Sequence, residues 1–127
     1  MKRILMSAYI EGTVEALEMY RKAFHADLGY HVKNDDGTYY HAELDIYGYV
    51  LGMSERTGGE AVPGNTMQYC LHFEESEKDK IDQAYEVLKE GAQILHPLGA
   101  CDYTSYMTDL IDRFGIRWCL FYAEDES

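Results

Sequence analysis

The sequence predicts an α+β fold in which one set of elements occurs twice: a strand, a helix and three further strands. Apolar runs, helical spacings and turn residues follow in this order on both sides of residues 55–65, a glycine-rich stretch with one proline. Matching positions keep a nearly constant separation, since Ile10 corresponds to Phe73 (offset 63) and Gly48 to Gly115 (offset 67). An internal repeat on this scale indicates a duplicated module.

The first module is predicted at about residues 1–54. The apolar run at 4–10 has strand length, and Thr13 is a candidate N-cap for the helix that follows. One apolar face recurs along this helix with helical spacing, at Leu17, Tyr20 and Phe24. Three strands separated by turn residues complete the module, at about 27–33, 38–46 and 49–54.

The second module is predicted at about residues 66–127, after the linker at 55–65. Residues 67–73 alternate as a strand, and Ser76 is a candidate N-cap for a helix that ends before Gly91. The apolar face of this helix has members at Ile81, Ala84, Tyr85 and Leu88. A short strand at 92–95 is expected to be broken by Pro97 and Gly99, and the last two strands are expected near 106–111 and 116–122.

Length and charge exclude several classes of function. The chain has 127 residues, a size at which a single domain is expected, and its 23 acidic and 11 basic side chains give a net charge of −12. Nucleic acids and anionic membrane surfaces attract clustered Lys and Arg, so neither is an expected partner. The motifs of serine hydrolases, zinc proteases, phosphate-binding loops and dinucleotide sites do not occur in the sequence.

The cysteines indicate a reducing compartment. Cys70, Cys101 and Cys119 are odd in number and have no CxxC spacing, which is typical of a cytoplasmic protein and not of a disulfide framework. The apolar N-terminal stretch ends at Glu11, too early for a signal peptide, and no run approaches the length of a membrane span. A cytoplasmic location is therefore expected.

Three stretches resemble a known family. EALEMYRKAF (15–24), HAELDIYGYVLGMSE (41–55) and DRFGIRWCLF (112–121) are similar to segments of the vicinal oxygen chelate superfamily, the group of glyoxalase I and bleomycin resistance proteins, in its PhnB-like branch. The resemblance implies a single domain in which two βαβββ modules form an open curved sheet, or cup. It also implies a homodimer.

Many members of this superfamily hold a divalent metal ion in the cup, with ligands from the first and last strand of each module. Carried over by position, these ligands fall on Leu5, Gly52, Gln68 and Cys119. Leucine and glycine side chains cannot ligate, and one Gln with one Cys supplies too little charge and mixes hard and soft donors. The resemblance therefore implies a cup without metal or other cofactor.

Strand alternation predicts which side chains line the cup. It places Tyr9, Gln68, His72 and Arg117 there. The resemblance adds Tyr103 and Tyr106, which lie in the loop and strand that form a wall of the cup in the family, so the candidate ligand-binding residues are Tyr9, Gln68, His72, Tyr103, Tyr106 and Arg117. Arg117 can pair with an anionic group. Five of these residues also have a plain structural interpretation: the tyrosines as good strand formers, His72 as a solvated histidine and Arg117 as an interface or surface charge.

Two small-molecule functions follow from these patterns, beside a third possibility in which the dimer is a structural or regulatory partner of another protein and the cup is vestigial. The first is a metal-free protein that binds or sequesters a small molecule, as the resemblance to bleomycin resistance proteins implies. The second is a divalent-metal lyase, isomerase or dioxygenase acting on a small oxygenated substrate. Its metal ligands would be drawn from His41, Glu43, Gln68, His72 and Cys119, although the pattern of His41 and Glu43 favours the solvent-facing side of a half-exposed strand.

Overall fold

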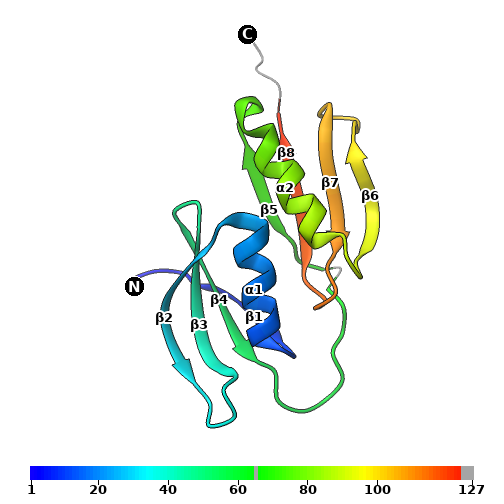
Figure 1. Ribbon diagram of the computed structural model, residues 1–127. Helices are drawn as coiled ribbons and strands as arrows, with labels where there is room; N and C mark the ends of the chain where they lie inside the picture. The colour runs from blue at the N-terminus through cyan, green and yellow to red at the C-terminus, as the bar shows by residue number, and fades with distance from the viewer. Residues whose placement is uncertain (65, 124–127) are drawn as a thin grey trace. The chain divides into compact units, whose positions relative to one another are not determined.

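The computed structural model describes residues 1–64 and 66–123 and divides into two compact units, module one (Met1–Glu60) and module two (Ala61 onward). The boundary between them falls inside the predicted linker at 55–65. Each module has the predicted order of a strand, a helix and three strands, with an additional short 3-10 helix η1 in module two (Figure 1). No helix in the described part of the chain is long and apolar enough to cross a membrane.

Module one is a four-stranded mixed sheet in the order β1-β4-β3-β2, with one helix on it. Strand β1 pairs with β4 in parallel, and the other pairs are antiparallel. Its elements are β1 (Met6–Ile10), α1 (Thr13–Phe24), β2 (Asp27–Lys33), β3 (Tyr39–Ile46) and β4 (Tyr49–Glu55).

Module two repeats this topology with the order β5-β8-β7-β6. Strand β5 pairs with β8 in parallel, and β7 pairs with both neighbours antiparallel. Its elements are β5 (Tyr69–Phe73), η1 (Glu75–Glu77), α2 (Lys78–Leu88), β6 (Gln93–Gly99), β7 (Tyr106–Ile111) and β8 (Arg117–Tyr122).

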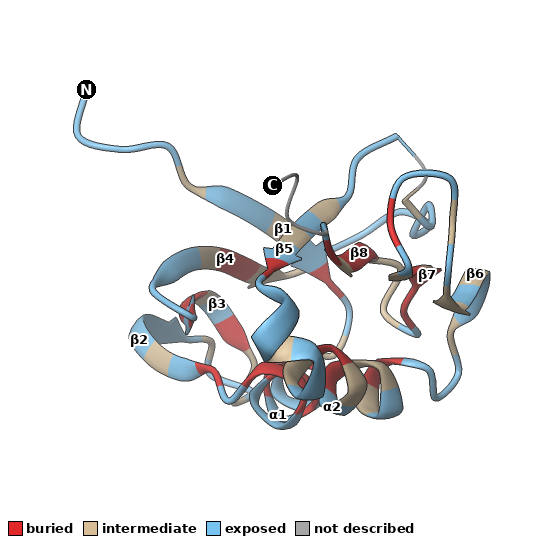
Figure 2. Cartoon of the chain, turned by 90° about the horizontal axis from the view of Figure 1, so that it is seen from above, coloured by how far each residue is buried: buried red, intermediate tan, exposed pale blue. Residues whose placement is uncertain are grey.

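In each module the core lies between the helix and one face of the sheet. Figure 2 shows buried residues along one side of each helix, and α1 contributes Leu17, Tyr20 and Phe24 to this core. From α2 the buried side chains are Ile81, Ala84 and Leu88, as the helical spacing predicts. The opposite face of each sheet carries no helix of its own module, and it is there that candidate site residues gather.

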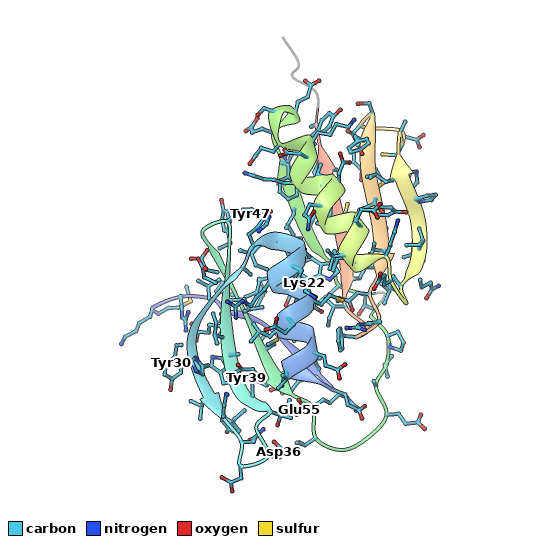
Figure 3. The ribbon with its side chains drawn as sticks, in the orientation of Figure 1. Lys22, Tyr30, Asp36, Tyr39, Tyr47 and Glu55 are labelled. Carbon is cyan, nitrogen blue, oxygen red and sulfur yellow. The ribbon has the colours of Figure 1, made fainter. Side chains whose placement is uncertain are left out.

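The predicted helix caps are wrong in both modules. Thr13 is the first residue of α1, and the cap position is Gly12, which has a φ of 96°. In place of a local cap, Glu55 at the end of β4 accepts hydrogen bonds from the backbone amides of Gly12 and Thr13, both at 2.9 Å (Figure 3). In module two Glu74 and Glu77 form a capping box around η1, so Ser76 does not cap the helix.

The predicted end of the sixth strand is also wrong. Strand β6 continues from Gln93 through Pro97 to Gly99. Proline is tolerated here because β6 is the edge strand of its sheet, where one row of backbone amides has no ladder partner to lose.

Candidate functional site

The face of the module-two sheet that α2 does not cover brings together four of the predicted site residues. Along β8, Trp118, Leu120 and Tyr122 are buried on the helix side. Alternation places the residues between them on the other side. We call this surface the helix-free face; it comprises Cys70 and His72 of β5, Met107 and Asp109 of β7, and Arg117, Cys119 and Phe121 of β8.

An aromatic cluster occupies one end of the helix-free face. The His72 ring stacks on Phe121 with a centroid distance of 4.5 Å and an interplanar angle of 17°. Tyr103, in the loop before β7, meets the same phenyl ring edge-on at 5.9 Å. Because His72 is exposed and Tyr103 is 62% exposed, this cluster presents aromatic surface to solvent.

A charged pair lies beside the aromatic cluster. The Arg117 guanidinium donates to both carboxylate oxygens of Asp109, from Nε at 3.0 Å and from Nη2 at 2.7 Å. Gln68, the residue before β5, reaches the same carboxylate with its amide nitrogen at 3.5 Å. The hydrogen bond to Asp109 raises the pKa of Arg117. Asp109 already compensates the positive charge of Arg117. This face therefore offers hydrogen-bond donors to a ligand, but the charge of Arg117 is not available to balance an anionic one.

The Tyr103 side chain interacts with the thiols of Cys101 and Cys119. Although the residue as a whole is largely exposed, desolvation of its phenol group, followed by interactions with Cys119 and Cys101, raises the pKa of Tyr103 to about 12. Its hydroxyl is therefore a neutral hydrogen-bond donor at physiological pH. The face thus combines a stacking surface with neutral and charge-compensated polar groups.

Tyr106 lies apart from the other predicted residues of module two. It pairs with Tyr122 across the β7–β8 ladder, and its hydroxyl donates to Asp82 of α2, so it belongs to the helix side of the sheet. Burial, then the hydrogen bond to Asp82, raises its pKa to about 12. The Lys78 ammonium lies 4.6 Å from the centre of its ring. The expectation that Tyr106 shares a surface with Arg117 and His72 does not hold in module two.

The sixth predicted residue, Tyr9, lies on β1 of module one and is 70% exposed. Register places Ser7, Gly52 and Glu43 in one row across β1, β4 and β3. The matching row in module two is Cys70, Cys119 and Asp109. Each row thus ends in a carboxylate, a correspondence that follows from the duplication.

The carboxylate of module one is also paired with arginine. Arg3 donates to both oxygens of Glu43, at 3.0 and 2.9 Å, and His41 Nε2 lies 2.8 Å from Oε2. Hydrogen bonds from Arg3 and then His41 lower the pKa of Glu43 to about 2. Glu43 is therefore an ionised, neutralised carboxylate on the helix-free side of its own sheet.

Acid should weaken module one through this carboxylate. A carboxyl whose pKa falls from 4.5 to about 2 on folding stabilises the protein fully above the higher value and loses that stabilisation as the pH falls toward the lower one. We expect Glu43→Gln to have a flatter dependence of melting temperature on pH between 4.5 and 2 than the parent protein. Glu60→Gln, at an exposed position, serves as the control. If the melting temperatures of Glu43→Gln and the parent protein fell equally between pH 4.5 and pH 2, this role of Glu43 would be contradicted.

The residues at the expected metal positions do not fit a divalent ion. Gly52 has no donor, and a Cβ built there would lie 3.0 Å from Leu5 Cδ2 and 3.1 Å from Ser7 Oγ. Within residues 1–64 and 66–123, no three His, Cys, Asp or Glu side chains are grouped so that they can hold a metal ion. The nearest carboxylates, Glu43 and Asp109, are both occupied by arginine. The described residues at these positions therefore do not form a ligand set for a divalent metal ion.

Sequence reasoning missed Asp109 and Arg3, the partners of Arg117 and Glu43. Asp109 carries a usable signal, because it matches Glu43 at an offset of 66, close to the offsets of 63 and 67 that define the repeat. Arg3 carries no such signal in the sequence. It precedes β1, and only the folding of the chain brings it to Glu43, 40 residues away.

Comparison with solved structures shows which fold this is. The putative 3-demethylubiquinone-9 3-methyltransferase PhnB protein from Bacillus cereus superposes with a TM-score of 0.80, at 21% identity over 96% of this chain and 100% of that one. Protein PA1353 from Pseudomonas aeruginosa gives 0.79, at 20% identity over 98% and 100%. The chain has the vicinal oxygen chelate fold.

This fold includes more distant relatives. The fosfomycin resistance protein FosX from Listeria monocytogenes superposes with a TM-score of 0.72, at 12% identity over 99% of this chain and 97% of that one. No protein-family model matches the sequence, and no curated protein is similar to it in sequence. At these identities the vicinal oxygen chelate fold is what the similarity establishes, because one fold hosts many functions.

Proposed function

We propose that this chain binds a small planar organic molecule on the helix-free face of module two and holds it without a metal ion. The exposed cluster of His72, Phe121 and Tyr103 supports the proposal, because stacked aromatic surface beside hydrogen-bonding groups is suited to a flat ligand with a polar edge. Gln68 and the Tyr103 hydroxyl supply donors at that edge. Tyr9, which lies in module one, stays a prediction that the contacts within module two do not test.

The charge distribution argues against a phosphonate ligand. A FosX variant is described in complex with Mn(II) and dihydroxypropylphosphonic acid. Here Arg117 is compensated by Asp109, two of the four expected metal positions (Leu5 and Gly52) have no donor atom, and the chain has a net charge of −12. We therefore expect the negative net charge to disfavour an anionic ligand here, since Arg117 is already paired with Asp109.

The metal-enzyme alternative has weaker support. Of its candidate ligands, His41 and Glu43 meet in module one, where Arg3 already neutralises the carboxylate. The other three, Gln68, His72 and Cys119, lie in module two. Elemental mass spectrometry of freshly purified, dialysed protein separates the two functions: about one transition metal per chain would favour the enzyme.

Two further features are part of the proposal. We expect a homodimer in solution, to be tested by light scattering, in which the mass of a single chain would overturn the expectation. We also expect the protein to work in the cytoplasm, the compartment that an odd and sparse set of three cysteines favours.

Variants of the aromatic cluster test where the ligand binds. We expect His72→Ala and Tyr103→Ala each to weaken binding of a stabilising planar compound by about five- to tenfold, because each removes one ring contact worth about 1 kcal/mol. Tyr106→Phe is the matched control, since its ring lies on the helix side and should leave binding unchanged. Titrations followed by the melting temperature, in chelator, measure these affinities. Equal affinities in all three variants would move the ligand away from this face.

A further inference from the structure

Two of the three cysteines of the chain lie on the helix-free face of module two, and the third lies in the loop beside it. Cys70 lies on β5, Cys119 on β8 and Cys101 in the loop before β7. The Tyr103 side chain interacts with both Cys101 and Cys119, and Cys119 interacts with Cys70. Segments separated by up to about fifty residues in sequence thus bring their thiols close to one another.

Cys70 and Cys119 are the pair with the geometry of a dithiol. They are direct register partners in the parallel β5–β8 ladder, so both side chains leave the same face of the sheet. Adjacent strands lie about 4.8 Å apart. That spacing lies inside the range of about 4.4–6.8 Å between the Cα atoms of disulfide-bonded cysteines. The spacing of the two Cα atoms is therefore compatible with a disulfide bond.

The two thiols differ in accessibility, which sets the order of their reactions. Cys70 is exposed, whereas Cys119 is only 3% exposed. Burial, then the interaction with Cys70, raises the pKa of the Cys119 thiol to about 12. Cys119 is thus protonated and shielded at neutral pH, and an external reagent meets Cys70 first.

We propose that Cys70 and Cys119 are a reversible redox site that a low-molecular-weight disulfide converts to an intramolecular disulfide. In the first step the Cys70 thiolate attacks one sulfur of the reagent, forming a mixed disulfide and releasing one thiolate. In the second step the Cys119 sulfur attacks Cys70 and gives up its proton, and the second reagent thiolate leaves and takes up a proton. The two protein thiols are oxidised by two electrons, and the reagent disulfide is reduced to two thiols.

This site stands on module two alone and does not depend on the ligand proposed above. Cys101 takes no part in the bond, because it is not a register partner of either cysteine; its loop is held by a hydrogen bond from its amide to the Thr104 carbonyl at 2.9 Å. It therefore provides a matched control, a thiol in the same cluster without the ladder geometry.

Oxidised glutathione, mixed with reduced glutathione in varied ratios, is the probe. We expect the folded wild-type protein to lose two hydrogen masses, and peptide mapping to place the bond between Cys70 and Cys119. Cys101→Ser should behave in the same way. Cys119→Ala should stop at a stable glutathione adduct on Cys70, and Cys70→Ser should leave Cys119 unmodified while the protein remains folded.

Three results would overturn the proposal. One is a wild-type protein that keeps all three thiols at every glutathione ratio while folded. Another is a bond that maps to Cys101. The third is a Cys70→Ser variant that reacts at Cys119 as readily as the parent. If Cys119→Ala fails to fold, the wild-type and Cys101→Ser maps decide the question without it.

Discussion

Asp112→Ala is expected to lower the free energy of unfolding by about 3 kcal/mol, because it removes the acceptor for several buried donors at once. Asp112 is 3% exposed at the turn between β7 and β8. Its carboxylate accepts from the Trp118 indole nitrogen at 2.9 Å and from the backbone amides of Phe114 and Ile116 at 2.8 and 3.1 Å. Trp118 is 1% exposed, so its N–H has no access to water as a substitute.

Urea denaturation measures this effect. Asp109→Ala is the control, because it removes the same group from the half-buried pair with Arg117, where we expect a loss below about 1 kcal/mol. In a double-mutant cycle, Trp118→Phe should recover part of the loss caused by Asp112→Ala, since the indole donor is then absent. Equal losses for Asp112→Ala and Asp109→Ala would contradict the assigned role of Asp112.

Glu55→Ala is expected to destabilise module one by about 2 kcal/mol. The Glu55 carboxylate accepts from the amides of Gly12 and Thr13 and from the Thr13 hydroxyl, at 2.9, 2.9 and 2.8 Å. Thr13 is fully buried, and its hydroxyl oxygen accepts in turn from the Tyr39 amide at 3.0 Å. One side chain therefore connects the start of α1 to β4 and, through Thr13, to β3.

The pKa of Glu55 reflects the same contacts. Burial alone would raise it, but the hydrogen bonds from Thr13 and Gly12 outweigh burial and leave the pKa below its ordinary value. Glu55→Gln keeps one acceptor oxygen, so it should lose less stability than Glu55→Ala. Glu60→Ala, at an exposed position, should lose almost none. Equal unfolding midpoints for Glu55→Ala and Glu60→Ala would show that α1 does not depend on this cap.

The element order could be predicted from the sequence because it depends on local patterns. Each strand and helix has its own apolar period, and Gly48 and Gly115 stand at turns with φ values of 90° and 87° that favour glycine. The helix caps could not be predicted in this way. Glu55 lies 43 residues from Gly12, and only the parallel pairing of β1 with β4 brings its carboxylate to the start of α1.

In the candidate site, too, the features that depend on local patterns could be predicted from the sequence, whereas those that depend on strand pairing could not. Alternation along β5 and β8 correctly groups His72 with Arg117 on one face, because the period of a strand is local. The family resemblance adds Tyr106 to this group through the segment that it shares with Tyr103, yet the register of β7 turns Tyr106 toward α2. The pairing of Asp109 with Arg117 depends on two neighbouring strands and needs the register of the sheet.

The measurement that tests metal-free binding most directly is the melting temperature of the protein in excess EDTA, across a panel of planar heteroaromatic metabolites with bleomycin and fosfomycin included. We expect at least one planar compound to raise the melting temperature saturably in EDTA, with the effect reduced in His72→Ala and Tyr103→Ala, and fosfomycin to have no effect with or without Mn²⁺. Two results would contradict metal-free binding on this face. One is a rise in melting temperature that requires added metal, and the other is a rise caused only by fosfomycin together with Mn²⁺.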